Sequence, residues 1–141
     1  MEFLKVRIEG VYRTDQGFLV TLEQEAGGEI LPIFVSGSQA QSIRLGLSEK
    51  EPPRPLTHDI FLQVIEDQDL VVESVAVDDL LKGTNTAELR LVRGDRTFPY
   101  DVRPSDAMAL AVRKDADIFV SEDVMKRAGK REEELFGKSK K

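Results

Sequence analysis

Residues 103–113 read Arg-Pro-Ser-Asp-Ala-Met-Ala-Leu-Ala-Val-Arg and carry the clearest structural signal in the chain. Pro104 presets the backbone angle of a first helical turn, where its missing N–H costs nothing, so a helix is expected to start here. Residues 107–112 are apolar on nearly all sides of that helix, until Arg113, which is typical of a helix buried in a core. A buried helix must be covered by other elements, and the flanking sequence contains them.

Strand patterns lie on both sides of this helix. Residues 86–92 and 97–102 form two strand-like runs joined by a hairpin loop at residues 93–96. Residues 118–120 follow the helix as a short apolar run, and residues 70–77 are rich in the β-branched side chains that favour strands. These runs predict sheet around the buried helix.

The first third of the chain has the pattern of an antiparallel meander. In residues 4–8 apolar and charged side chains alternate, which predicts a strand with one buried face. A second run begins at Gly17, and a third covers residues 30–35. Because Pro32 cannot donate to a ladder, the third strand should lie at an edge or be locally broken.

Helix signals complete the expected architecture. Ser36 and Gln39 fit a capping box, and Thr57 is a suitable N-cap for a following helix. Ser121 should cap a last helix that ends near residue 128. The apolar faces expected for the first two of these helices consist of Ala40, Ile43 and Leu47, and of Ile60, Phe61, Val64 and Ile65.

The sequence therefore predicts a single α+β domain with a mixed, largely antiparallel sheet and three or four short helices. We expect this domain to cover residues 1–128 and residues 129–141 to form a charged, flexible C-terminal tail, because lysine, arginine and glutamate dominate there.

Composition excludes several classes of chemistry. The 141 residues include no cysteine, so disulfides, thiolate nucleophiles and cysteine-bound metals are excluded. His58 is the only histidine, which excludes metal sites that need two imidazoles from one chain. The net charge of −6 argues against the broad attraction to phosphates used by basic nucleic-acid binders, but not against an enzyme that contacts nucleic acid locally.

The sequence also gives an expectation for where the protein is located in the cell. No apolar run approaches the roughly 20 residues needed to span a bilayer. Residues 1–5 lack the basic-then-apolar pattern of a secretion signal. We therefore expect a cytoplasmic protein without membrane association.

Two segments share one arrangement: Arg54-Pro55-Leu56-Thr57-His58-Asp59 and Arg103-Pro104-Ser105-Asp106. In each segment, called a junction below, an arginine and a proline precede a hydroxyl residue that can cap a helix, and an aspartate follows in the first turn. Helix capping and the helix dipole are sufficient to explain both. A helix start also binds anions, however, and arginine binds phosphate in bidentate fashion.

If the two junctions meet in space, they contain the parts for metal-assisted phosphodiester hydrolysis. His58 is the natural general acid or base, since histidine exchanges protons near neutral pH. Asp59 and Asp106 are the candidate ligands of a Mg²⁺ or Mn²⁺ ion that activates water, with no organic cofactor expected. The candidate substrate-binding residues are Arg54, Thr57, Arg103 and Ser105.

These motifs resemble the bifunctional nuclease domain family of small prokaryotic proteins with plant relatives. The resemblance spans about residues 3–128, and its most specific block is Pro-Pro-Arg-Pro-Leu-Thr-His-Asp at residues 52–59. It implies a mixed α/β domain, often dimeric, with nuclease activity on DNA and RNA, so nucleic acid and a second copy of the chain are the expected partners. The other matching segments are residues 31–33, 40–43, 103–111 and 118–120.

The sequence departs from the family pattern at two places. Gln39 stands where relatives often have a glutamate, which weakens any carboxylate role there. Asn85-Thr86 replaces an aromatic pair that often follows the Gly-Thr turn, and so removes one possible contact to a base.

Three hypotheses follow from these residues. The first is a metal-dependent nuclease that uses both junctions. The second is a non-catalytic module that binds a protein partner or an anionic ligand at the same surface. The third is that the aspartates and arginines are internal ion pairs, whose loss would unfold the protein.

Overall fold

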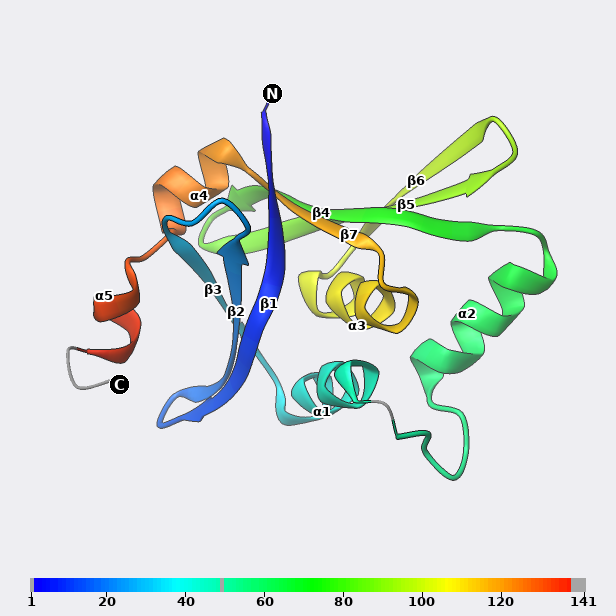
Figure 1. The fold of residues 1–141 in the computed structure, drawn as a ribbon, viewed down its shortest axis with the longest axis horizontal. Helices are drawn as coiled ribbons and strands as arrows, with labels where there is room; N and C mark the ends of the chain where they lie inside the picture. Colours follow the sequence, from blue (N-terminus) through cyan, green and yellow to red (C-terminus); the bar gives the residue numbers. More distant parts are fainter. Residues whose placement is uncertain (1, 49, 138–141) are drawn as a thin grey trace.

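The computed structural model describes residues 2–48 and 50–137, and Figure 1 shows them as one twisted sheet with helices around it. The strands are β1 (Phe3–Thr14), β2 (Gly17–Gln24), β3 (Ile30–Val35), β4 (Val71–Leu81), β5 (Thr84–Arg93), β6 (Arg96–Val102) and β7 (Asp117–Ser121). The helices are α1 (Gly37–Leu47), α2 (Thr57–Asp67), α3 (Pro104–Lys114), α4 (Glu122–Ala128) and α5 (Glu132–Phe136). The predicted α+β class with a mixed sheet is confirmed.

The sheet order is β3-β2-β1-β7-β4-β5-β6. All neighbouring strands are antiparallel except β4 and β7, which run parallel. The short strand β7 therefore joins the N-terminal meander to the β4–β6 half of the sheet. The meander is confirmed, and β3, which carries Pro32, lies at the edge as the missing N–H requires.

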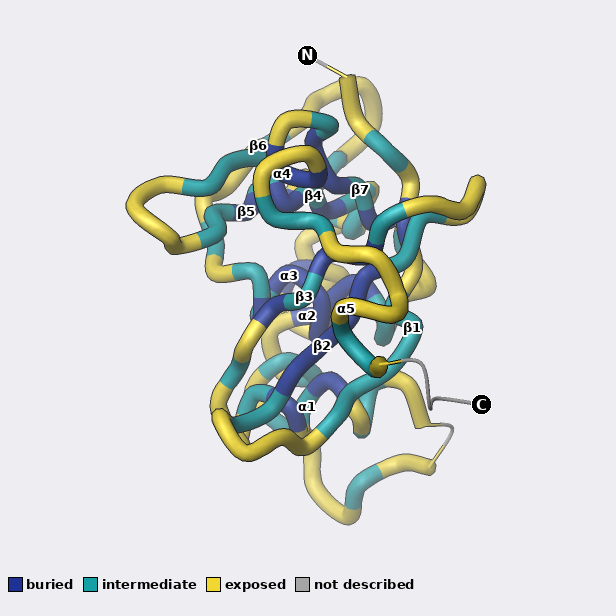
Figure 2. The backbone as a smooth tube through the Cα atoms, turned by 90° about the vertical axis from the view of Figure 1, so that its left-hand side faces the viewer, coloured by how far each residue is buried: buried dark blue, intermediate teal, exposed yellow. Residues whose placement is uncertain are grey.

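Helix α3 forms the core together with the sheet, as its sequence predicts. The side chains of residues 107–111 are buried, and α1 lies alongside α3 on the same face of the sheet (Figure 1). Figure 2 shows the buried residues along the central strands and along parts of α1 and α3, with the loops and outer turns exposed. Burying apolar surface between two layers is the main source of stability for such a domain.

Both helix starts at the junctions differ from the prediction that a hydroxyl residue caps each one. Thr57 and Ser105 lie inside the helices, and the N-caps are Leu56 and Arg103, neither of which makes a side-chain capping bond. In α2 the carboxylate of Asp59 supplies the cap instead, because its Oδ2 accepts a hydrogen bond of 2.8 Å from the backbone N–H of Leu56.

The predicted apolar face of α2 is confirmed at Ile65, which is buried, and is wrong at its other three residues. Ile60, Phe61 and Val64 are 51%, 39% and 54% exposed. The buried residues are Leu62 and Ile65, because α2 projects away from the sheet and only this side meets the rest of the fold (Figure 1). His58 lies four residues before Leu62, and therefore on the same inner face.

Leu47, predicted on the buried face of α1, is 49% exposed, while Ala40 and Ile43 are buried as expected. The segment predicted as a tail contains α5, and the backbone of Lys130 pairs with that of Ile30. Residues 138–141 of that segment lie outside the described residues. Among the described residues, no helix combines the length and the hydropathy that crossing a membrane requires.

Candidate functional site

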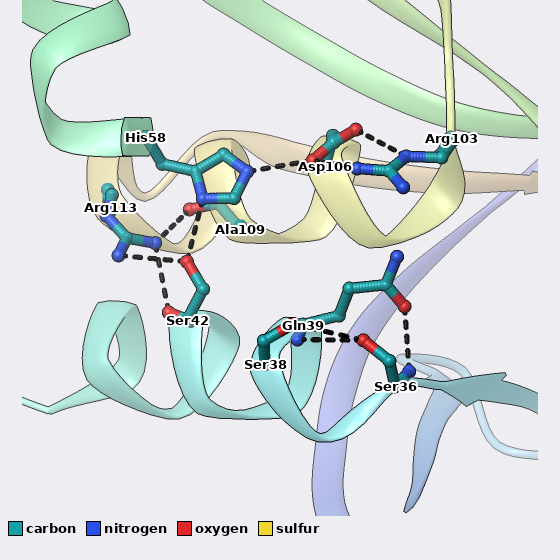
Figure 3. A network of polar contacts seen from close by, with 9 residues as sticks. All are labelled: Ser36, Ser38, Gln39, Ser42, His58, Arg103, Asp106, Ala109 and Arg113. Atoms are coloured by element: carbon teal, nitrogen blue, oxygen red, sulfur yellow. Dashed lines mark hydrogen bonds and ion pairs between the residues drawn. The ribbon is translucent and has the colours of Figure 1, made fainter. Parts of the chain in front are cut away.

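The two junctions meet in the folded chain. His58 Nε2, from the start of α2, lies 2.9 Å from Asp106 Oδ1 at the start of α3 (Figure 3). These residues are 48 positions apart in the sequence. The side chains of His58 and Asp106 keep 19% and 30% of their surface exposed, so this contact lies at the surface and not inside the core.

Asp106 also binds the arginine of its own junction. Arg103 Nε donates to Oδ2 over 2.9 Å, and Arg103 Nη2 donates to Oδ1 over 3.3 Å. Burial of the Asp106 carboxyl acts to raise its pKa, but the hydrogen bonds from Arg103 and His58 outweigh burial and lower the pKa below its ordinary value. Asp106 is therefore a carboxylate near neutral pH.

The second nitrogen of His58 contacts helix α1. Ser42 Oγ lies 2.7 Å from His58 Nδ1 (Figure 3). Because a carboxylate only accepts hydrogen bonds, a neutral ring must carry its proton on Nε2, facing Asp106. Nδ1 is then the basic nitrogen, and it accepts a hydrogen bond from the Ser42 hydroxyl. Ser42, His58 and Asp106 thus form one chain of hydrogen bonds across three helices.

Arg113 holds the other half of this network, and its side chain is only 8% exposed. Its Nε donates to Asp59 Oδ1 over 2.8 Å. Its Nη1 donates to the backbone carbonyls of Ser42 and Ala109, over 3.1 and 2.9 Å. One buried guanidinium therefore connects α1, α2 and the last turn of α3.

Asp59, the predicted partner of Asp106 at a shared metal, faces this arginine. Burial of the carboxyl acts to raise the pKa of Asp59, but the hydrogen bonds from the backbone of Leu56 and from Arg113 lower it overall. Asp59 thus performs a capping and ion-pairing role at its junction.

The fold brings three of the predicted site residues, His58, Asp106 and Arg103, into direct contact. Arg54 lies in the exposed coil before α2, Thr57 is exposed in its first turn, and Ser105 is buried at the start of α3. The predicted substrate-binding role of these three residues stays a prediction.

Sequence reasoning missed Ser42 and Arg113. Arg113 interrupts an otherwise apolar helix, and an arginine at such a position signals a paired, buried cation. Ser42 gives no comparable signal, because a serine in an exposed-looking helix has no distinctive pattern.

The predicted metal ligands do not fit a divalent cation in their present arrangement. Both oxygens of Asp59 and both of Asp106 already accept hydrogen bonds, with an arginine on each carboxylate. Within residues 2–48 and 50–137, no group of three or more histidine, aspartate or glutamate side chains is placed to hold a metal ion. A cation at either aspartate would have to compete with the arginine that already binds there.

The lowered pKa values predict how stability depends on pH. A carboxylate with a depressed folded-state pKa stabilises the fold above its unfolded-state pKa of about 4, and this stability is lost as the pH falls through the folded-state pKa. We expect the melting temperature of the wild type to fall more steeply than that of Asp106→Asn between about pH 5 and pH 2. Parallel curves from differential scanning calorimetry would contradict the proposed stabilisation of this carboxylate.

Comparisons with known proteins identify the family. A family model described as the bifunctional nuclease domain matches residues 20–133. The chain is 38% identical over 127 residues to two uncharacterized proteins of Mycobacterium tuberculosis, from strains CDC 1551 and H37Rv. In each case the similarity covers 89% of this chain and 76% of the relative. The matched region contains both junctions and the network between them.

Proposed function

The chain belongs to the bifunctional nuclease domain family, and from this membership we propose that it cleaves phosphodiester bonds of nucleic acid at His58, Asp106 and Arg103. The observation that carries the proposal is the 2.9 Å contact between His58 and Asp106. It joins a proton-transfer group, a carboxylate that orients it, and an exposed arginine at a helix start, which are the parts that phosphodiester hydrolysis needs.

Each of these residues has a distinct part in the proposed reaction. Arg103, whose side chain is 68% exposed, binds the phosphate and stabilises the charge that develops on it. Asp106 fixes the tautomer of His58, so that Nδ1 is the base. The water oxygen forms a bond to phosphorus, and the water gives one proton to Nδ1 through the Ser42 hydroxyl. The bond from phosphorus to the leaving oxygen breaks, and His58 returns the proton to that oxygen.

Dependence on Mg²⁺ or Mn²⁺ remains a prediction of the proposal. The steps above name only the roles of the chain's own residues, and a bound cation would add stabilisation of the charge on the phosphate. Cleavage of labelled DNA and RNA oligonucleotides, measured with each metal and again after chelation by EDTA, tests the requirement. Full activity after chelation would remove the cation from the proposal.

The proposal predicts that Arg103→Gln weakens substrate binding. Removing a charged contact to phosphate should raise KM by about 10-fold or more, since hydrogen bonds to charged groups are the strong ones. The melting temperature should change little, because the side chain is exposed. Arg96→Gln, at the exposed β5–β6 turn, is the matched control and should keep the wild-type KM. Equal KM values in all three proteins would contradict the role of Arg103.

Ser42→Ala separates a proton relay from a nucleophile. If Ser42 only relays and positions, its loss removes one hydrogen bond and should lower kcat by about 2- to 10-fold, since water can take the place of the hydroxyl. A loss of more than about 10⁴-fold, together with a phosphorylated serine detected by mass spectrometry, would make Ser42 the nucleophile instead.

The alternative function is a non-catalytic module that binds an anionic ligand or a protein partner. The observation that favours it is the exposed apolar side of α2, formed by Ile60, Phe61 and Val64. This reading expects no cleavage by the purified wild type at any metal concentration, but ligand-induced stabilisation that Arg103→Gln reduces. Metal-dependent or metal-free turnover that disappears in His58 variants would reject it.

A cytoplasmic location and a homodimer are part of the proposal. The exposed side of α2 is the surface on which we would first test the dimer. Sedimentation equilibrium of the wild type and of Val64→Lys measures the oligomeric state directly, and a monomeric wild type would remove this element of the proposal.

A further inference from the structure

A groove of about 880 Å³ adjoins Arg103, next to the site described above. Its walls come from β3, from the turn between β4 and β5, from the start of α3 and from the end of α4. A volume of this size is typical of pockets that hold small organic ligands. The hydrolysis proposed above uses only the edge of this groove, at Arg103.

The groove is positive although the whole chain is negative. Its charged lining residues are three cations, Arg103, Arg127 and Lys130, and one acid, Asp101, whereas the chain carries a net charge of −6. Arg127 is already paired with Asp123 and with the carbonyl of Leu80. Arg103 is also paired, with Asp106, but its side chain is 68% exposed, against 47% for Arg127. Arg103 and the exposed Lys130 are therefore the cations that an anion entering the groove reaches most readily.

The remaining lining suits a nucleobase. Phe34 on the edge strand β3 lines the groove and is 56% exposed, so its ring is accessible for stacking. Asn85, near the start of β5, also lines it. Its Oδ1 is buried without a hydrogen-bond partner among the described residues. A buried amide of this kind costs free energy until a ligand supplies the missing group.

We infer that this groove binds one unpaired nucleotide, so that the substrate of the proposed nuclease is single-stranded nucleic acid or a frayed end. The inference rests on the proposed function. The phosphate contacts Arg103 and Lys130, and the base stacks on Phe34. A rotation of the Asn85 side chain toward the groove lets an N–H group at the edge of the base donate to its Oδ1. A base within a duplex cannot make these contacts, because its face is stacked and its edge is paired.

Binding of adenosine 5′-monophosphate to the full chain tests the inference without involving cleavage, since this molecule contains no phosphodiester bond. Isothermal titration should detect the nucleotide, with inorganic phosphate and adenosine each binding at least about 10-fold more weakly. A short single-stranded oligonucleotide should compete with the nucleotide, and a blunt duplex of the same sequence should compete poorly. Phosphate that binds as tightly as the nucleotide would overturn the role of the base.

Two matched pairs of variants locate the contacts. Phe34→Leu should weaken nucleotide binding by at least about 5-fold while leaving phosphate binding unchanged, because stacking is lost and the charges remain. Tyr100→Leu removes an equally exposed aromatic ring outside the groove and should have no effect. Lys130→Gln should weaken both ligands, whereas Lys126→Gln, an exposed lysine outside the lining, should not.

Failure of this inference is distinct from failure of the proposed function. The wild type could cleave nucleic acid and yet bind the nucleotide no more tightly than the Phe34→Leu and Asn85→Ala variants. This result would overturn nucleotide binding in the groove and leave the proposed nuclease activity intact. If nucleotide binding depends on Phe34 but no cleavage is detected, the groove is supported as a nucleotide site and the proposed nuclease activity is overturned.

Discussion

His58→Gln is expected to lose about 10²- to 10⁴-fold in kcat for nucleic-acid cleavage, the range that general acid–base catalysis contributes. A glutamine amide can still donate a hydrogen bond toward Asp106, but it cannot take up and return a proton. The loss should appear mainly in kcat, because Arg103 still binds the phosphate. Cleavage of a labelled oligonucleotide under saturating conditions measures it.

His58→Asn is the companion variant, because its amide lies near the position of Nδ1 and can keep the contact to Ser42. Each variant thus preserves one of the two hydrogen bonds made by the ring. If both fold, as judged by melting temperature, and both lose activity, then proton transfer and not positioning is the function of His58. A folded variant that cleaves at the wild-type rate would remove His58 from the reaction.

Arg113→Met is expected to lower the free energy of unfolding by about 2–4 kcal/mol. Breaking a buried ion pair from one side costs about 3–5 kcal/mol, and we expect a smaller value because water still reaches part of the carboxylate left behind. Asp59, that carboxylate, is 30% exposed. Three further hydrogen bonds to α1 and α3 are lost with the guanidinium. Urea unfolding with linear extrapolation measures the difference.

Lys114→Met is the matched control for this prediction. Lys114 is the next residue of α3 and pairs with Glu66 on α2, but both side chains are more than one third exposed. Exposed pairs contribute about 0–1 kcal/mol, so this variant should remain close to the wild type. Equal losses of unfolding free energy in the two variants would show that the burial of Arg113 does not determine its contribution to stability.

The contacts of Arg113 and His58 distinguish two hypotheses about the junctions. One is that the junctions form internal ion pairs, and the other is that they form a reactive site. The contact between Asp59 and Arg113 is mostly enclosed and attaches α2 to the core, as the ion-pair hypothesis expects. The contact between Asp106, His58 and Arg103 is open to solvent and contains the only group suited to proton transfer. We therefore assign stability to the first contact and propose reactivity for the second.

Much of the fold follows from local signals. The alternation in residues 4–8 predicts β1, Pro32 predicts an edge strand, and the capping box of Ser36 and Gln39 starts α1 as expected. The apolar sequence of α3 predicts a buried helix. Each of these signals lies within one helix or strand, either in its local hydrogen bonds or in the apolar face that it must bury. Each can therefore be recognised without knowing which other elements pack against that helix or strand.

The buried face of α2 shows where such local signals fail. Ile60, Phe61 and Val64 form a better apolar stripe than the true inner side does. The side that packs contains His58, Leu62 and Ile65, because two hydrogen bonds at His58 fix the rotation of the helix. Hydrophobic periodicity takes no account of polar contacts such as those of His58. It therefore predicts burial for the apolar side chains that in fact remain at the surface.

The amino-acid sequence alone sufficed for the fold class, the order of the elements, the chemical groups present and the family, since all of these depend on local pattern and residue identity. The partners of those groups required the folded chain. His58 meets Asp106, 48 positions away in the sequence, whereas Asp59 meets Arg113, 54 positions away. Which acid faces the imidazole depends on how α1, α2 and α3 pack against one another. Side-chain packing between elements distant in sequence leaves no mark in the spacing of either motif.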